Sequence, residues 1–456
     1  MNIKDYKHIY MVGIGGISMS GIAEILVKWG YKVSGSDSTK SSQTDWLEDN
    51  GIHVNIGQVS ENITKDIDLL IYTAAIKDDN PELVRARELD IPMVERGNFL
   101  GELTKLFKDT IGVAGTHGKT STTSMVSLAF LEAGLDPSIQ VGAVLKQIDG
   151  NYRVGNSDYF IIEACEYHES YLNFKQRSAI VTNIDDDHLD YFGNIDNIKK
   201  SFEKYVSLLP SDGYLVLNRD DERCYDLRNS TKAKVITVGS NNNADWYYDN
   251  VTFDEDGYPS YDVYHKGKLL KRVSLKVPGL HMVFDSLCCI ALCDAYGISI
   301  DTIAKALLKY TGASRRLEYK GIINDAKVYD DYGHHPTEIN ATVKGILNKK
   351  FHESWVVFEA HTYSRLSQHL KDFAKSLIYF DHIIIIDIYA AREVNTYNIH
   401  EEDLIKEIRN LGKDAVHISN HDEVVQYLKE NVHKDDIVLT LGAGNVTKIA
   451  NLLVNS

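Results

Sequence analysis

A stretch of small and hydroxyl residues constrains this chain more than any other feature. Residues 112–123 read Gly-Val-Ala-Gly-Thr-His-Gly-Lys-Thr-Ser-Thr-Thr, after an apolar segment that begins at Ile111 and before a predicted helix over residues 124–131. A glycine turn between a strand and a helix aims backbone N–H groups and the positive helix end at one point. Lys119 adds a full positive charge there, and Thr120 adds a hydroxyl that can bind Mg²⁺. The stretch therefore predicts a phosphate-binding loop in an α/β fold.

The same loop departs from the general phosphate-loop pattern. That pattern has glycine five positions before Gly118, where this chain has Val113. A glycine turn that binds no phosphate is the alternative interpretation. The coincidence of strand, glycines, lysine and hydroxyl favours phosphate binding.

Length and charge limit the organisation and the partners of the chain. Its 456 residues exceed one ordinary core and indicate two to four domains of roughly 100–200 residues. A net charge of −16 disfavours nucleic acid, because a duplex binder needs a basic face. The five cysteines form no Cys-x-x-Cys pair, and no segment approaches the ~18 apolar residues of a membrane span. We expect a cytoplasmic protein with no nucleic-acid or membrane partner.

The first hundred residues alternate apolar strands with amphipathic helices, which predicts a doubly wound α/β unit. We expect strands over residues 8–12, 32–36 and 67–72 and a helix over residues 18–29. The glycines at positions 13, 15, 16 and 21 resemble a dinucleotide fingerprint, although Ser18 occupies its third glycine position. Asp37 ends the second strand and is either a ribose ligand or a polar strand end.

Two further α/β units follow, beginning near Asp109 and near residues 311–316. Between them, Tyr-, Asp- and Val-rich alternation over residues 244–277 predicts an antiparallel β insert. A helix is expected over residues 195–209 and another over residues 281–296. The strands predicted in these units are 159–162, 179–182, 214–217, 327–329, 354–358, 382–387 and 437–440.

Polar residues directly follow several of these strands. Glu163 follows one, and residues 185–188, Asp-Asp-Asp-His, follow the next. Ligands bind at the carboxyl ends of parallel strands, and Mg²⁺ prefers hard oxygen ligands such as those of Thr120 and Glu163. His188 is either a metal ligand or a residue that orders its loop.

Basic residues and histidines gather in the last unit. Arg315 and Arg316, on a connection between two sheets, are either a clamp on phosphate oxygens or surface arginines. Asp330, Asp331, His334 and His335 follow one predicted strand, and Arg365 follows another. The basic groups among these strand-end residues suit a carboxylate-bearing substrate.

These residues, taken in order, resemble the Mur ligase family. The resemblance covers essentially the whole chain, and its motifs are residues 12–16, 19–24, 115–120, 163–166, 182–188, 315–316, 330–338, 361–365, 391–393 and 442–445. It implies a Rossmann-like UDP-substrate domain over residues 1–108, a central P-loop ATPase-like parallel sheet with a β insert over residues 109–312, and a C-terminal Rossmann-like α/β ligase domain over residues 313–456.

The resemblance also implies an activity. It is the ATP-dependent ligation of L-alanine to the lactyl carboxylate of UDP-N-acetylmuramate through an acyl phosphate, in peptidoglycan precursor synthesis. ATP and Mg²⁺ are the implied cofactors, and a monomer or a homodimer the implied state. The alternatives are a murein tripeptide ligase acting on the same UDP-sugar, an NAD(P)-dependent oxidoreductase, and a nucleotide-gated binding protein. The residues His-Thr-Tyr-Ser-Arg at 361–365 favour alanine addition.

Site residues carry over by the same resemblance. The implied ATP-binding residues are Gly115, Thr116, His117, Gly118, Lys119, Thr120, Ser121, His281, Arg316 and Asp331. The implied UDP-substrate residues are Gly13, Ile14, Gly15, Gly16, Asp37 and Thr73, and the implied metal ligands are Thr120, Glu163 and His188. The implied catalytic residues are Lys119, Glu163, His188, His335 and Arg365. The chain departs from the family pattern at Met282 and Asp285, where asparagines are common, and at Cys165 and His168, where acids are common.

Overall fold

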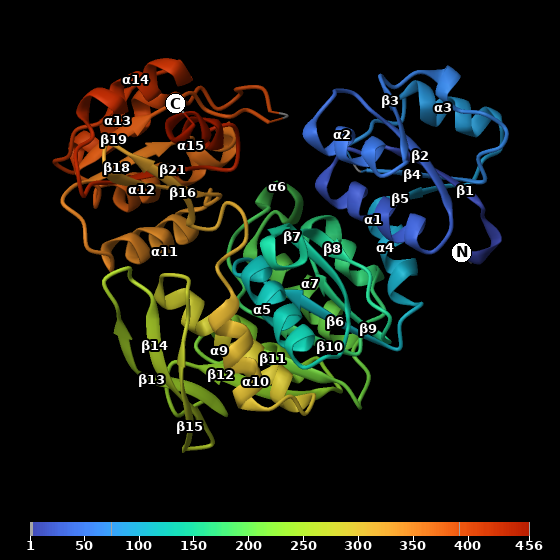
Figure 1. Cartoon of the computed structure of the whole chain (residues 1–456), viewed down its shortest axis with the longest axis horizontal. Coiled ribbons are helices and arrows are strands. Elements are labelled where there is room, and N and C mark those ends of the chain that lie inside the picture. Colours follow the sequence, from blue (N-terminus) through green and yellow to red (C-terminus); the bar gives the residue numbers. More distant parts are fainter. Residues whose placement is uncertain (1–2, 74, 392, 456) are drawn as a thin grey trace. The chain divides into compact units, whose positions relative to one another are not determined.

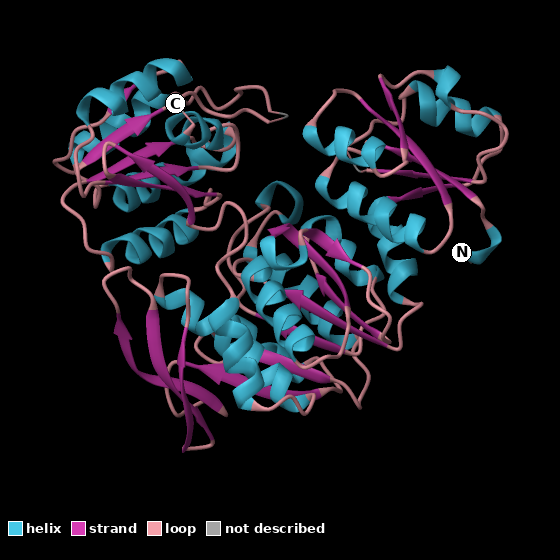
Figure 2. Cartoon of the chain, viewed as in Figure 1, coloured by secondary structure: helices cyan, strands magenta, loops and turns pink. Residues whose placement is uncertain are grey.

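The computed structural model describes residues 3–73, 75–391 and 393–455, which form three sheets with flanking helices (Figures 1 and 2). The chain divides into two compact units. The first unit contains Met1–Tyr247, Tyr264–Leu269 and Asp285–Ala306, and the second contains Tyr248–Val263, Leu270–Phe284 and Leu307–Ser456. No helix of the described residues is long and apolar enough to cross a bilayer.

The N-terminal sheet is parallel and has the order β3-β2-β1-β4-β5. Its strands are β1 (His8–Val12), β2 (Lys32–Asp37), β3 (His53–Ile56), β4 (Leu69–Tyr72) and β5 (Met93–Glu95). Its helices are α1 (Ile17–Lys28), α2 (Ser42–Asp49), α3 (Pro81–Glu88) and α4 (Arg96–Thr104). Along β1, Ile9 and Met11 enter one buried cluster and Tyr10 and Val12 another, so both faces of the sheet are covered. The doubly wound prediction is confirmed here.

The central sheet places β6 between β9 and β10, in the order β15-β14-β13-β12-β11-β10-β6-β9-β7-β8. Its strands are β6 (Asp109–Ala114), β7 (Ser138–Leu145), β8 (Gly150–Arg153), β9 (Tyr159–Glu163), β10 (Ser178–Val181), β11 (Tyr214–Asn218), β12 (Lys234–Gly239), β13 (Trp246–Phe253), β14 (Pro259–His265) and β15 (Lys268–Ser274). The associated helices are α5 (Lys119–Glu132), α6 (Leu189–Phe192), α7 (Ile195–Ser207), α8 (Glu222–Asp226), α9 (Leu280–Ala295) and α10 (Ile300–Lys309). The pairs around β6 are parallel, which brings their carboxyl ends to one edge.

Two parts of this sheet are antiparallel. The predicted β insert is β13, β14 and β15, which are neighbours in the sheet. The turn between β14 and β15 has only two residues, so these two strands are antiparallel. The hairpin of β7 and β8, also antiparallel, was not among the predicted strands. Short 3₁₀ segments lie at Ile3–Asp5, Ser60–Asn62, Lys146–Ile148, Tyr167–Asn173 and Leu227–Asn229.

The C-terminal sheet has the order β16-β17-β21-β18-β19-β20 and is parallel except for its edge strand β16. Its strands are β16 (Glu318–Ile323), β17 (Ala326–Asp331), β18 (Ser354–Phe358), β19 (His382–Ile385), β20 (Val416–His417) and β21 (Ile437–Leu441). Its helices are α11 (Pro336–Leu347), α12 (Tyr363–Leu377), α13 (Glu401–Asn410), α14 (His421–Asn431) and α15 (Thr447–Val454). Val356 and Phe358 face one buried cluster and Trp355 and Val357 the other, which confirms a second doubly wound sheet.

The turn between β13 and β14, residues 254–258, packs against the sheet of the second unit and is called the insert turn below. Lys349 is 8% exposed, and its Nζ donates to the backbone oxygen of Asp256 at 2.6 Å. The same ammonium lies 5.3 Å from the ring centre of Tyr258 and 4.8 Å from that of Tyr329. Lys327 donates to Asp256 Oδ1 at 2.8 Å. Burial lowers the pKa of Lys349 to about 8, because desolvation penalises its charge.

The pKa of Lys349 gives a first testable prediction. Unfolding returns this group from about 8 toward its ordinary value of 10.5, so between these pH values the unfolded chain holds a proton that the folded chain has released. The wild type should therefore gain stability with rising pH relative to Lys349→Met, by up to about 1.4 kcal/mol per pH unit. Denaturant unfolding of both chains across this window measures the difference. Stability curves that stay parallel would contradict the prediction.

Candidate active site

The predicted phosphate loop connects β6 to α5, as its sequence pattern requires. Gly115 and Gly118 have φ values of +131° and +82°, which favour glycine. A Cβ at Gly115 would lie 2.0 Å from Thr182 Oγ1, and one at Gly118 would lie 2.7 Å from Asp285 Oδ1. The loop is therefore packed too closely to accept a side chain at either glycine position. Thr120 and Ser121 lie in the first turn of α5, where backbone N–H groups lack helical partners.

Lys119 folds back over this loop. Its Nζ donates to the backbone oxygens of Gly115 and Thr116 at 2.6 and 2.9 Å and forms an ion pair with Glu166 at 3.0 Å. Burial is the largest single influence on the pKa of Lys119 and lowers it, but the charges of Glu166 and Glu163 and the hydrogen bond to Glu166 act together with their neighbours to raise the pKa overall. Lys119 therefore stays a cation. Glu166 lies in the motif 163–166, but no role is predicted for it above; its spacing of three residues from Glu163 was the available signal.

Glu163 joins the phosphate loop to the β7–β8 hairpin. Its Oε1 accepts from the Thr120 hydroxyl at 3.2 Å, and its Oε2 accepts from the backbone N–H of Gly142 at 2.7 Å. The structure thus brings together Thr120 and Glu163, two of the three predicted metal ligands. The predicted strand ends at residue 162, with Glu163 directly after it. In the structure β9 is one residue longer, and Glu163 is its last residue.

The third predicted ligand, His188, contacts other residues. Its backbone is left-handed at φ +54°, its N–H donates to Asp187 Oδ1 at 2.8 Å, and its ring centre lies 4.5 Å from that of Tyr167. These contacts agree with the loop-ordering interpretation. They leave metal ligation by His188 a prediction.

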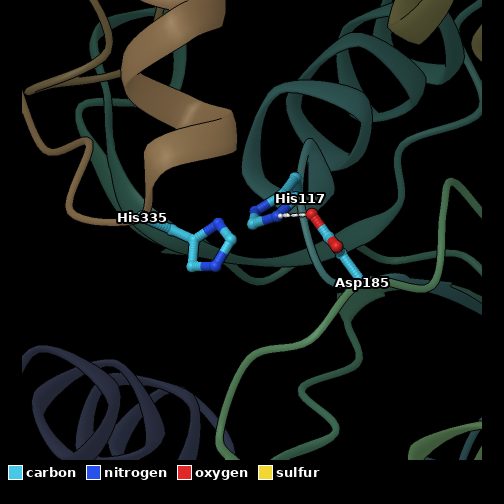
Figure 3. A group of neighbouring side chains, drawn as sticks. All are labelled: His117, Asp185 and His335. Carbon is cyan, nitrogen blue, oxygen red and sulfur yellow. Dashed lines mark hydrogen bonds and ion pairs between the residues drawn. The ribbon is translucent and has the colours of Figure 1, made fainter. Parts of the chain in front are cut away.

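His117 ties the phosphate loop to the segment after β10. Its Nε2 lies 3.1 Å from Asp185 Oδ2, and its backbone N–H donates to Asn183 Oδ1 at 2.9 Å (Figure 3). Thr116 adds a side-chain acceptor for the Asp185 N–H at 2.9 Å. His335, drawn in the same figure, belongs to the second unit. The loop and the 182–188 segment therefore form one hydrogen-bonded edge.

The N-terminal glycine loop runs from β1 to α1. Gly13 has φ +80°, and a Cβ there would lie 2.9 Å from Thr73 Cγ2. Gly15 donates its N–H to Asp37 Oδ2 at 3.0 Å. Ile14 donates to the Ser36 oxygen at 2.9 Å, and Gly16 caps α1. Asp37 thus holds the loop in place, a contact that neither interpretation of its strand-end position included.

In the second unit, Asp331 and His281 have shifted pKa values. Burial raises the pKa of Asp331 to about 6, and its carboxylate accepts from the N–H groups of Leu317 and Gly333, each at 2.7 Å. Desolvation, reinforced by the charge of Arg316, lowers the pKa of His281 to about 4. His281 is therefore neutral near pH 7. Arg316 lies with its guanidinium 5.4 Å from the ring centre of Tyr332.

Arg315 does not stand free for a phosphate. Its Nε donates to Asp330 Oδ2 at 3.3 Å, and its Nη2 donates to the Gly442 oxygen at 2.5 Å. Asp330 is fully buried and also accepts from the hydroxyls of Thr440 and Thr447 at 2.6 and 2.8 Å. Arg315 thus fixes the connection before β16 to the turn after β21, a role that neither interpretation of the arginine pair included, and the phosphate clamp stays a prediction.

His335 and Arg365 begin the helices that follow two strands of the C-terminal sheet. His335 is buried and accepts at Nδ1 from the Thr337 N–H at 3.3 Å, as the N-cap of α11. Arg365 lies in the first turn of α12, with Nη1 3.2 Å from His361 Nδ1. Glu393 accepts from the Ser364 N–H at 2.9 Å and so anchors the 391–393 motif, of which Arg392 lies outside the described residues.

Three stretches of the chain match described protein families. Residues 8–108 match the Mur ligase family, catalytic domain; residues 113–293 match the Mur ligase middle domain; and residues 315–444 match the Mur ligase, glutamate ligase domain. The chain therefore belongs to the Mur ligase family.

Individual relatives are similar over nearly the whole length. The UDP-N-acetylmuramate–L-alanine ligase of Acetivibrio thermocellus is 45% identical over 98% of this chain and 96% of its own. The protein of the same name from Caldanaerobacter subterraneus is 42% identical, over 98% and 97%. The crystal structure of the UDP-N-acetylmuramate-alanine ligase of Thermotoga maritima matches with a TM-score of 0.85 at 28% identity, covering 99% and 98%. A murein peptide ligase from Psychrobacter arcticus, at 23% identity and TM-score 0.71, shares the fold.

The buried pair of Arg315 and Asp330 gives a second prediction. Arg315→Met should destabilise the second unit by about 3 kcal/mol, because it leaves a buried carboxylate without its cation. Thr447→Val, which removes one hydroxyl donor to the same carboxylate, should cost about half as much. Urea unfolding followed by circular dichroism measures both. An Arg315→Met midpoint equal to that of the wild type would show that the pair contributes no net stability.

Proposed function

We propose that the chain joins L-alanine to the lactyl carboxylate of UDP-N-acetylmuramate, with conversion of ATP to ADP and phosphate. The observation that carries this proposal is the arrangement of Lys119, Thr120 and Glu163 at the carboxyl edge of a parallel sheet. It occurs in a chain whose relatives, at 42–45% identity over nearly the full length, are named for this reaction.

Mg²⁺ is proposed to bind at Thr120 and Glu163. Their oxygens lie 3.2 Å apart at the start of α5, and a hydroxyl with a carboxylate is a donor set that suits a hard cation alongside phosphate oxygens. The ion, when bound, would neutralise charge on the transferring phosphoryl group. His188 is proposed as a ligand only by the family resemblance.

The chemistry requires activation of a poor electrophile. Attack of the lactyl carboxylate oxygen on the γ-phosphorus of ATP forms an acyl phosphate and releases ADP. Lys119 and the amides of residues 115–120 offset the repulsion between the two anions, and the raised pKa of Lys119 keeps it charged for this role. The alanine amine then attacks the acyl carbon, phosphate leaves and an amide remains.

The remaining site assignments form part of the same proposal. His281, Arg316 and Asp331 are proposed to bind ATP, and His335 and Arg365 to bind the substrate and alanine. The loop of Gly13 to Gly16, with Asp37 and Thr73, is proposed to bind the UDP moiety. The boundaries at residues 108 and 312, the cytoplasmic location and a monomeric or dimeric state stay predictions.

The third prediction concerns Lys119. Lys119→Ala should reduce ADP release by about 10²–10³-fold, because it removes the cation that folds over the loop. UDP-N-acetylmuramate binding, measured by calorimetry without nucleotide, should stay within about twofold of the wild type. The glycine loop proposed to bind the UDP moiety follows β1, which belongs to another sheet than β6. The exposed Lys200→Ala is the matched control and should keep full turnover. Comparable turnover in Lys119→Ala would refute the central assignment.

The choice of acceptor is tested by coupled measurement of ADP release with UDP-N-acetylmuramate. Alanine, serine, glycine and the murein tripeptide are offered in turn, and alanine should give the largest kcat/KM. A preference for the tripeptide would favour murein peptide ligation instead. Absence of ADP release with every acceptor, despite nucleotide binding, would indicate a binding protein.

A further inference from the structure

The β7–β8 hairpin touches the candidate metal site at one end. Gly142, in β7, donates its backbone N–H to Glu163 Oε2 at 2.7 Å. A Cβ at Gly142 would lie 2.5 Å from Glu163 Oε1, so the hairpin backbone presses directly against this carboxylate. β7 also pairs with β9, the strand that ends in Glu163. The position of the hairpin therefore sets the position of the carboxylate.

The other end of the hairpin touches the helix that follows the N-terminal glycine loop. Tyr152, in β8, is 3% exposed and its ring lies against Gly21 of α1, where a Cβ would be 1.7 Å from Tyr152 Cδ2. Its hydroxyl lies 3.3 Å from Ser18 Oγ, and the neighbouring Asn151 donates to the Ile17 oxygen at 3.0 Å. The hairpin thus contacts the first turns of α1, next to Gly16.

One continuous buried cluster joins these two ends. It contains Tyr152 together with Ile22 and Ile25 of α1 and with Ile162, the neighbour of Glu163. Packed interiors transmit displacement because they resist compression. A shift of α1 would therefore move Tyr152, the hairpin and the Gly142 contact with Glu163.

We propose that the β7–β8 hairpin couples the UDP-sugar loop to the Mg²⁺–ATP site, with Tyr152 as the positioning residue that links them. The inference rests on the proposed function. Binding at either loop fixes one end of the hairpin and so reduces the cost of ordering the other end. Such coupling is reciprocal, and factors of about 5–150 are typical between linked sites.

Calorimetry tests the coupling on the full chain. The Kd of UDP-N-acetylmuramate is measured alone and with saturating Mg²⁺ and a non-hydrolysable ATP analogue, and their ratio is the coupling factor. We expect at least about fivefold tighter binding with the nucleotide in the wild type. Tyr152→Ala should reduce the factor to near 1, while Tyr152→Phe, which keeps the ring on Gly21, should retain it.

A second variant acts on the other end of the hairpin and covers the case that Tyr152→Ala does not fold. Gly142 is exposed, so Gly142→Ala keeps the buried cluster intact while its Cβ displaces Glu163. It too should bring the factor toward 1. Because the factor is measured at saturating nucleotide, a uniform loss of nucleotide affinity does not change it.

The outcomes separate the inference from the proposed function. A wild-type factor of 1, or factors in folded Tyr152→Ala or Gly142→Ala equal to the wild type, overturns the coupling while ligation still proceeds. If the wild type binds neither ligand and releases no ADP with alanine, the proposed function itself fails.

Discussion

The candidate site depends on the parallel pairing of β6 with its two neighbours. Val113 is opposite Glu163, and Ala114 is opposite Val181, so the loop after β6, the carboxylate that ends β9 and the segment after β10 share one edge of the sheet. Antiparallel pairing would send these groups to opposite edges. The contact of Thr120 with Glu163 and that of His117 with Asp185 both follow from this arrangement.

At that edge of the sheet, the charge of Lys119 is balanced by a carboxylate within a chain that is acidic overall. With a net charge of −16, the protein offers an anionic ligand no general attraction. Affinity for phosphate must come from local donors. Lys119 is already neutralised by Glu166, so a nucleotide has to replace a carboxylate rather than meet an uncompensated cation. When no anion is bound, the ion pair with Glu166 compensates the charge of the partly buried Lys119, because an isolated charge removed from water is costly.

Much of this architecture could be predicted from the sequence, because it depends on patterns among residues that are near one another in the chain. The strand over residues 8–12, the phosphate loop and Glu163 at a strand end all depend on neighbours in the chain, and the structure has them within a residue. Contacts between distant segments could not be predicted. The ion pair of Arg315 with Asp330 and its hydrogen bond to Gly442 are one case, because nothing nearby in the sequence reveals these partners. The β7–β8 hairpin was not predicted for a related reason, because it depends on the contact between Tyr152 and Gly21, which are far apart in the sequence.

The insert turn has a consequence for how the chain can be divided. Asp256 and Tyr258 are held by Lys327 and Lys349, which follow them by seventy or more residues, and the two segments cluster in one unit. A fragment that ends at residue 312 would carry the turn without these partners and expose the tyrosine that they cover. The second unit is thus discontinuous in sequence. A fragment that begins at residue 313 lacks the insert turn that contacts Lys327 and Lys349 in the full chain. If the chain is divided at residue 312, each of the two expressed fragments therefore has an incomplete surface.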